Sequence, residues 1–155
     1  MKRQRLRKKE AKRIAEEIKV NFGIEIGSEI DRIEIDGRGV LLVEGEPILL
    51  EYNERYYFTV YGIMKFKPER GMVVVDEGAV KFVINGADVM KPGIIEADET
   101  IKKDEFCHVV VEKKLTPLAV GIALLDGKEM IGKKGKAVKN IHHLNDKIWK
   151  SIFKK

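Results

Sequence analysis

The N-terminal segment repeats its hydrophobic residues at the spacing of an α-helix. Those on the shared face are Ala11, Ile14, Ala15 and Ile18. Charged side chains occupy the opposite face, and Gly23 stands where the left-handed residue that ends many helices is expected. This pattern predicts a helix over residues 4–21.

After residue 25 the hydrophobic residues come in short runs that are bounded by turn residues. An imperfect alternation of isoleucines in residues 29–36 ends at a turn marked by Gly37 and Gly39. Three further strands are predicted at Val40–Val43, Ile48–Tyr52 and Tyr56–Ile63. With the helix they predict an α+β domain over residues 1–71, whose polar, turn-rich end is residues 68–71.

Residues 72–155 are predicted to form a second domain, made mainly of strands. Its strand-like runs are "MVVVD", "AVKFVING", "FCHVVVE" (Phe106–Glu112), "PLAVGIALLDG" (Pro117–Gly127) and a last strand from about Lys136. Gly86 is expected to open a short helical turn, which Pro92 and Gly93 end. Short strands separated by frequent turns indicate a small barrel or sandwich.

The composition indicates a folded protein that does not enter a membrane. Of the 155 residues, 44% are hydrophobic and 35% are charged, and no apolar run approaches the roughly 20 residues of a membrane span. The basic start is not followed by the apolar segment of a secretory signal. Because Cys107 is the single cysteine, an internal disulfide and a cysteine-cluster zinc site are excluded. We therefore expect a cytoplasmic protein.

The net charge of +5 conceals two basic ends around an acidic middle. Residues 1–19 carry nine Lys or Arg against three Glu, and residues 128–155 carry nine Lys against two acidic residues. Residues 20–127 carry 12 basic and 20 acidic residues. This segregation favours a polyanionic partner that is met by the ends of the chain. Two ordinary solvated surfaces are the alternative.

The C-terminal basic segment contains a glycine loop, "MIGKKGKAVKNIHHLNDKIW" (Met130–Trp149). Residues 127–134 have the glycine and lysine spacing of a nucleotide-binding P-loop, but Lys134 replaces the Ser or Thr that holds magnesium. The Gly-x-x-Gly clamp of KH domains fits "IGKKGKAVKNI", but a strand precedes it where that clamp needs a helix.

A third interpretation comes from a family resemblance. "VINGADVMKPGII", "FCHVVVE", "LAVGIALL" and "GKKGKAVKNIHHLNDKIW" together resemble a PUA domain, the small RNA-binding pseudo-barrel that is appended to several RNA-modifying enzymes. The whole chain resembles the two-domain family that contains the malignant T-cell-amplified protein and the N-terminal part of ligatin. The resemblance implies a pre-PUA domain of α+β class, followed by a mainly-β PUA pseudo-barrel.

The resemblance also implies where RNA binds. In PUA domains the glycine-containing turn beside the short helix, here Gly86, Ala87 and Asp88, lies against RNA, where small residues and free N–H groups admit a sugar-phosphate. The expected opposite wall of the groove is Lys91, Pro92, Gly93 and Ile94. Four lysines are expected at its rim as point charges for phosphate: Lys133, Lys134, Lys136 and Lys139.

The remaining candidates for chemistry do not assemble an active site. His142 and His143 are adjacent on a predicted strand, where side chains point to opposite faces, so we expect one packed and one exposed histidine and no metal site. Cys107 and His108 lie in an apolar strand, which indicates an inert thiol. The tyrosines of residues 52–61 are interpreted mainly as core, and the carboxylates of residues 96–99 as surface.

We therefore expect a non-catalytic RNA-binding protein that needs no cofactor. By resemblance it acts in the translation apparatus, in initiation, reinitiation or recycling, and contacts the 3′ end of tRNA or the small ribosomal subunit. An initiation-factor-like protein is the expected partner of the N-terminal domain. The alternatives are a protein-docking module with incidental RNA contact, and an accessory subunit of an RNA-modification enzyme.

Overall fold

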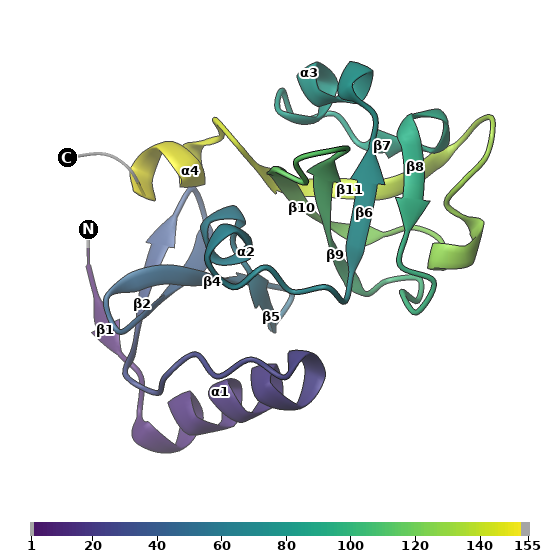
Figure 1. The fold of residues 1–155 in the computed structure, drawn as a ribbon. Coiled ribbons are helices and arrows are strands. Elements are labelled where there is room, and N and C mark those ends of the chain that lie inside the picture. Colours follow the sequence, from purple (N-terminus) through teal and green to yellow (C-terminus); the bar gives the residue numbers. More distant parts are fainter. Residues whose placement is uncertain (1, 153–155) are drawn as a thin grey trace.

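The computed structural model describes residues 2–152, which form two sheets with helices at their faces and ends (Figure 1). The first sheet has the order β1-β2-β3-β4-β5, with all neighbours antiparallel. Its strands are Gln4–Arg5, Ile30–Ile35, Arg38–Val43, Glu46–Tyr52 and Arg55–Phe58. Helix α1 (Lys8–Phe22) buries Ala11, Ile14 and Ile18 in the core of this domain. The predicted α+β domain is therefore observed.

The predicted start of the first helix is wrong. Gln4 and Arg5 form the short edge strand β1, which pairs with Arg32 and Asp31 of β2. Arg3 and Arg5 both donate hydrogen bonds to the carboxylate of Asp31, whose side chain is only 10% exposed. These bonds, from Arg5 first and then Arg3, lower the pKa of Asp31. They hold residues 3–5 against the sheet, so that α1 begins only at Lys8.

The predicted strand Tyr56–Ile63 is correct only in its first half. Strand β5 ends at Phe58, and helix α2 (Val60–Phe66) follows. The Thr59 hydroxyl accepts a hydrogen bond from the backbone N–H of Gly62 and so caps the helix. A Cβ atom at Gly62 would lie 2.4 Å from the carbonyl oxygen of Ile48, so glycine is what allows α2 to pack directly on β4.

The second sheet has the order β7-β11-β10-β9-β6-β8 and curves into a nearly closed pseudo-barrel (Figure 1). Only β6 and β9 run parallel to each other. In chain order its strands are β6 (Met72–Val75), β7 (Val89–Met90), β8 (Ile94–Ala97), β9 (Phe106–Val111), β10 (Pro117–Ala123) and β11 (Lys136–His143). The mainly-β second domain is thus confirmed, with β10 ending four residues before the predicted Gly127.

The run "AVKFVING", predicted as a strand, is helical. A 3₁₀ turn, η1 (Glu77–Ala79), leads into the short helix α3 (Val80–Val83). The Asp76 carboxylate accepts a hydrogen bond from the N–H of Ala79 and caps this segment. Because the apolar residues are β-branched and aromatic, their propensity indicated a strand, whereas the cap and the packing of Val83 decide for a helix.

Three shorter elements complete the chain. They are the 3₁₀ turns η2 (Lys91–Gly93) and η3 (Gly127–Glu129) and helix α4 (Lys147–Ile152). The closing strand expected in "NIHHLNDKIW" ends at His143, after which a turn leads into α4. Among the described residues, no helix is long and apolar enough to cross a membrane.

One of two hydrophobic clusters within residues 2–152 joins the two sheets. Val120, Ile122 and Ile141 of the second sheet belong to the same hydrophobic cluster as the N-terminal sheet and α1. The ring of Tyr57 stacks on that of Phe106 with their centroids 5.1 Å apart. The two domains are therefore packed against each other, and the domain boundary after residue 71 stays a prediction.

Candidate nucleic-acid interface

The turn of Gly86, Ala87 and Asp88 lies at the C-terminal end of α3, so the expectation that it opens a helix is wrong. The N–H of Gly86 donates to the carbonyl of Val83 at 3.0 Å, and the N–H of Ala87 donates to that of Phe82 at 3.0 Å. These N–H groups are therefore used within the turn. Gly86 adopts a left-handed φ of +96°, as a residue that ends a helix commonly does.

Hydrogen bonds from Asn140 of β11 hold this turn in place. Asn140 donates through its side-chain amide to the carbonyls of Val83 and Ala87, both at 3.0 Å, and its backbone N–H donates to the carboxylate of Asp88 at 3.0 Å. Lys136 lies 3.2 Å from the other carboxylate oxygen of Asp88. Asn140 was missed in the sequence, because its partners lie more than 50 residues away along the chain.

Four of the predicted wall residues, Ala87, Asp88, Pro92 and Gly93, line one groove of about 390 Å³, named here the α3 groove. Gly86 lines a separate pocket with Asn140 and His143, and Lys91 does not line the groove. The lining is mainly apolar and includes Phe82, whose side chain is 64% exposed, and Met90. Ile94, by contrast, is buried in the core of the second domain.

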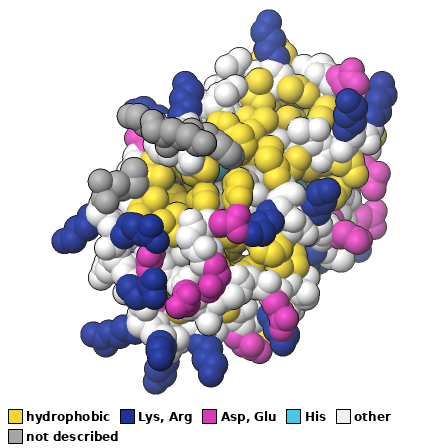
Figure 2. Space-filling model, turned by 60° about the vertical axis from the view of Figure 1, so that its left-hand side comes forward, with side chains coloured by type: hydrophobic (Ala, Val, Ile, Leu, Met, Phe, Trp, Pro, Cys, Tyr) yellow, Lys and Arg dark blue, Asp and Glu magenta, His cyan; other side chains and the backbone are white. Residues whose placement is uncertain are grey.

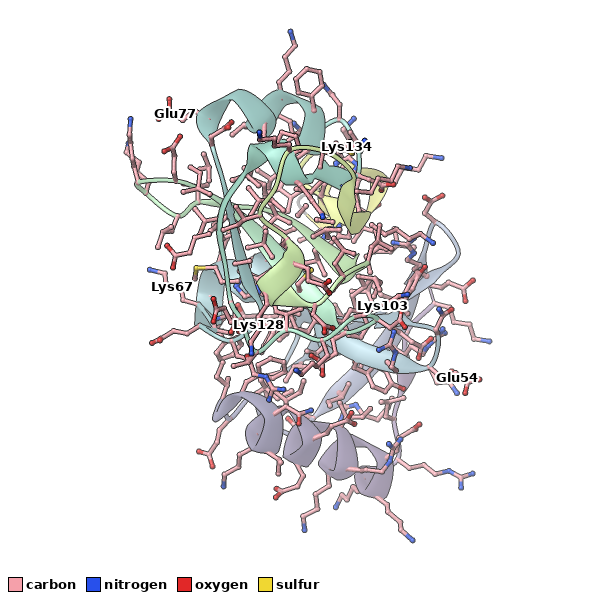
Figure 3. The ribbon with its side chains drawn as sticks, turned by 90° about the vertical axis from the view of Figure 1, so that its right-hand side faces the viewer. Glu54, Lys67, Glu77, Lys103, Lys128 and Lys134 are labelled. Atoms are coloured by element: carbon pink, nitrogen blue, oxygen red, sulfur yellow. The ribbon has the colours of Figure 1, made fainter. Side chains whose placement is uncertain are left out.

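The glycine loop lies beside the α3 groove. The N–H of Lys91 donates to the carbonyl of Gly135 at 2.9 Å, and a Cβ atom at Gly132 would lie 3.1 Å from Cδ of Lys91. Lys133 and Lys134, between these glycines, are exposed. Figure 3 places Lys134 at the same end of the domain as α3, whereas Lys103 and Lys128 lie toward the other end. Lys91, Lys133 and Lys134 thus form a basic rim.

The other two predicted rim lysines have different positions. Lys136 pairs with Asp88, so part of its charge is already neutralised within the protein. Lys139 points toward the N-terminal domain, where its Nζ lies 3.1 Å from the hydroxyl of Tyr52. The guanidinium of Arg38 lies over the same ring at 5.2 Å. Lys139 therefore lies at the junction between the domains.

A second basic surface lies at the other end of the molecule, on the exposed face of α1. It consists of Lys8, Lys9, Lys12 and Arg13, all exposed. Lys and Arg side chains cluster at the lower end of the molecule, where α1 lies (Figure 2). The α3 groove is at the opposite end, so an RNA in contact with both surfaces must extend along the whole molecule.

The cysteine thiol and two of the three histidine side chains are buried in the core. Burial raises the pKa of Cys107 to about 12 and lowers that of His108 to about 4, so both are neutral at pH 7. His142 is buried and lies 2.8 Å from Asp146, and His143 is half-buried on the other face of the strand. Within residues 2–152, no three His, Cys, Asp or Glu side chains are grouped to hold a metal ion.

Comparison with known proteins identifies both parts of the chain. Residues 71–144 match the model of the PUA domain, and residues 2–66 match that of a domain of unknown function, DUF1947. The protein MJ1432 of Methanocaldococcus jannaschii is 46% identical over 96% of this chain and 95% of its own length. Translation machinery-associated protein 20 of Schizosaccharomyces pombe is 32% identical over 81% of this chain and 74% of its own length.

Solved structures agree with these matches over almost the whole chain. A hypothetical protein of Pyrococcus horikoshii, PH0734.1, has a TM-score of 0.88 and 39% identity and covers 97% of this chain and 99% of its own. A conserved PUA domain protein from Thermoplasma acidophilum has a TM-score of 0.82 and 31% identity, with the same coverage of both chains. Mouse eukaryotic translation initiation factor 2D is 27% identical over 69% of this chain but only 20% of its own length.

Proposed function

The chain belongs to the two-domain PUA family of translation machinery-associated protein 20, and from this membership we propose that it is an RNA-binding protein of the translation apparatus. The proposal assigns it no catalytic step and no cofactor, because Cys107 and His108 are buried in the core and neutral at pH 7. The cytoplasm, where ribosomes work, is its proposed compartment.

The observation that carries the proposal is the position of the α3 groove beside the basic rim. The apolar lining of the groove suits the face of a nucleobase, and the exposed ring of Phe82 offers a stacking partner. The lysines at the rim suit the phosphates on either side of that base without reading its sequence. An unpaired strand provides bases that are free to enter a groove, whereas a duplex does not.

We propose the 3′ end of tRNA, or a single-stranded segment of ribosomal RNA, as the ligand of the α3 groove. Ala87, Asp88, Pro92 and Gly93 line the groove, with Gly86 and Lys91 next to them along the chain, and Lys133 and Lys134 face the phosphates. The basic face of α1 supplies a second, non-specific contact to the RNA backbone. Neutralising about six phosphates in total makes the affinity fall steeply with salt.

A protein partner is proposed in addition. In eukaryotic initiation factor 2D, the region similar to this chain is joined to further protein that makes up most of that molecule. An initiation-factor-like protein is therefore the proposed partner of this chain. The N-terminal domain is the proposed contact surface.

Gel-shift titration separates 3′-end binding from general RNA binding. Intact tRNA is compared with the same tRNA from which the terminal CCA has been removed, each at several salt concentrations. Loss of the CCA end should weaken binding by about tenfold and make the salt slope shallower by about 2, because the phosphates that face Lys133 and Lys134 are lost with it. Equal affinity for both RNAs would contradict the 3′-end proposal and leave only backbone binding.

A further inference from the structure

The junction between the domains carries a cleft of about 540 Å³, larger than the α3 groove and separate from it. One side is formed by α2 and the segment that follows it, and the other by the hairpin between β9 and β10. Its apolar lining residues are Ile63, Met64, Pro68, Met72, Val110, Leu115 and Pro117. This interdomain cleft therefore combines surface from both domains.

Leu115 adopts an unusual backbone conformation at the edge of the interdomain cleft. It has a left-handed φ of +56°, yet its side chain is 44% exposed. A leucine in this region costs about 1–2 kcal/mol, which glycine or asparagine would largely avoid. The turn does not account for the leucine, because a smaller residue suits this backbone conformation better. The core does not account for it either, because so much of the leucine side chain is exposed. Its position suits contact with an apolar ligand.

Two lysines flank the apolar lining, Lys67 from the α2 side and Lys114 from the hairpin side. The lining contains no aspartate or glutamate, and within residues 2–152 neither lysine forms an ion pair. Their charges therefore complement carboxylates on a ligand. The lining contains no Phe, Tyr or Trp, and the ring of His108 in it is buried, whereas the α3 groove offers the exposed ring of Phe82.

Two methionines in the lining support the same ligand chemistry. Met64 and Met72, two half-buried methionines, lie in the cleft lining. Methionine side chains adapt their shape to an incoming apolar group and so suit a peptide that arrives from another protein.

We propose that the interdomain cleft binds a segment of a partner protein in which large apolar side chains are flanked by Asp or Glu. The apolar side chains pack on Leu115, Val110 and the methionines, and the carboxylates pair with Lys67 and Lys114. This site differs from the contact proposed above through the N-terminal domain alone, and it requires both domains. It does not depend on RNA binding.

Selection of random 12-residue peptides displayed on phage, against the full chain, tests this proposal. Peptides that are enriched are synthesised with a fluorescent label and titrated by anisotropy against the wild type and two variants. Leu115→Asn removes the apolar side chain but suits the left-handed backbone, so it folds at least as stably as the wild type. Lys67→Glu/Lys114→Glu reverses the charges, and Lys81→Glu/Lys150→Glu is its matched control on exposed residues elsewhere.

The expected peptides are acidic and apolar. Leu115→Asn should weaken their binding by about tenfold or more, and the double charge reversal by at least about fivefold, while the control binds like the wild type. Peptides whose Asp and Glu are changed to Lys should regain binding to the charge-reversed variant. The proposal is overturned if the enriched peptides are basic, if they bind Leu115→Asn like the wild type, or if sedimentation shows that a second copy of the chain occupies the cleft.

Discussion

The hydroxyl of Tyr57 lies 2.7 Å from Nδ1 of His108, and this buried hydrogen bond joins the two domains. Tyr57 belongs to β5 of the N-terminal sheet and His108 to β9 of the second sheet. Burial raises the pKa of Tyr57 well above its usual value and lowers that of His108 to about 4. Both groups are therefore neutral at pH 7, and the bond is one between uncharged partners.

Stability should fall on acidification below pH 6.5. His108 has a pKa of about 4 in the folded chain and about 6.5 when unfolded, so between these values the unfolded chain binds more protons. The free energy of unfolding is unaffected by the titration of His108 above pH 6.5, and protonation of His108 in the unfolded chain lowers it by about 3 kcal/mol at pH 4. Urea unfolding at several pH values measures this slope, and His108→Leu, although less stable, should flatten it. An unchanged slope in that variant would assign the effect to other groups.

Removal of the Tyr57 hydroxyl should destabilise the chain. Tyr57→Phe keeps the ring that stacks on Phe106 but leaves Nδ1 of His108 buried without a partner, at a cost of about 1–3 kcal/mol. Tyr52→Phe is the matched control, because its hydroxyl contacts Lys139 at the exposed surface and should cost less than about 0.5 kcal/mol. Urea midpoints for both variants give the comparison. Equal losses of stability in the two variants would mean that the interdomain hydrogen bond stabilises the fold no more than a surface contact does.

Reversal of charge at the basic rim should weaken RNA binding. Lys133→Glu/Lys134→Glu removes two phosphate contacts, so the dependence of log affinity on log salt should become shallower by about 2. Lys103→Glu/Lys128→Glu changes the net charge equally at a distance from the α3 groove and serves as the control (Figure 3). Filter binding across a salt series distinguishes them. If both variants lose the same RNA affinity and the same salt slope, the basic rim makes no local contact with phosphates.

A side chain at Gly86 should lower the stability of the fold directly, whatever its effect on RNA binding. A Cβ atom there would lie 3.2 Å from Nε2 of His143, on a backbone with a φ of +96°. Gly86→Ala should therefore lower the free energy of unfolding by about 1–2 kcal/mol. Phe82→Ala, at an exposed position, should leave stability nearly unchanged and weaken RNA binding. Thermal unfolding and gel shift, performed on both variants, separate the two effects; full stability of Gly86→Ala would contradict this account.

The sequence predicted the layers of the fold and misassigned its short elements. Strands β3 and β4 were found because their apolar residues match the periodicity of a sheet. Helices α2 and α3 were predicted as strands, since both consist largely of β-branched and aromatic residues. Thr59 and Asp76, which cap them, were the available local signals. The β1 strand had no local signal, because it depends on Asp31, 26 residues beyond Arg5 along the chain.

The candidate site was predicted in its parts but not in their arrangement. The resemblance indicated both walls of the α3 groove, and the structure brings Ala87 and Pro92 into one lining. Exposure of Phe82 and burial of Ile94 depend on how α3 and β8 pack, and residue type alone does not show it. The position of Lys139 at the domain junction follows from its contact with Tyr52, a partner 87 residues away.

Under the proposed RNA binding, the core shared by the two domains also sets how affinity depends on RNA length. Because that core fixes the α3 groove and the basic face of α1 relative to each other, neither surface moves to meet a short ligand. An oligonucleotide too short to reach both binds through one surface, and one that is long enough gains the second contact within a single molecule. Affinity then rises with RNA length in one step, and the length at that step reports the distance between the two basic surfaces.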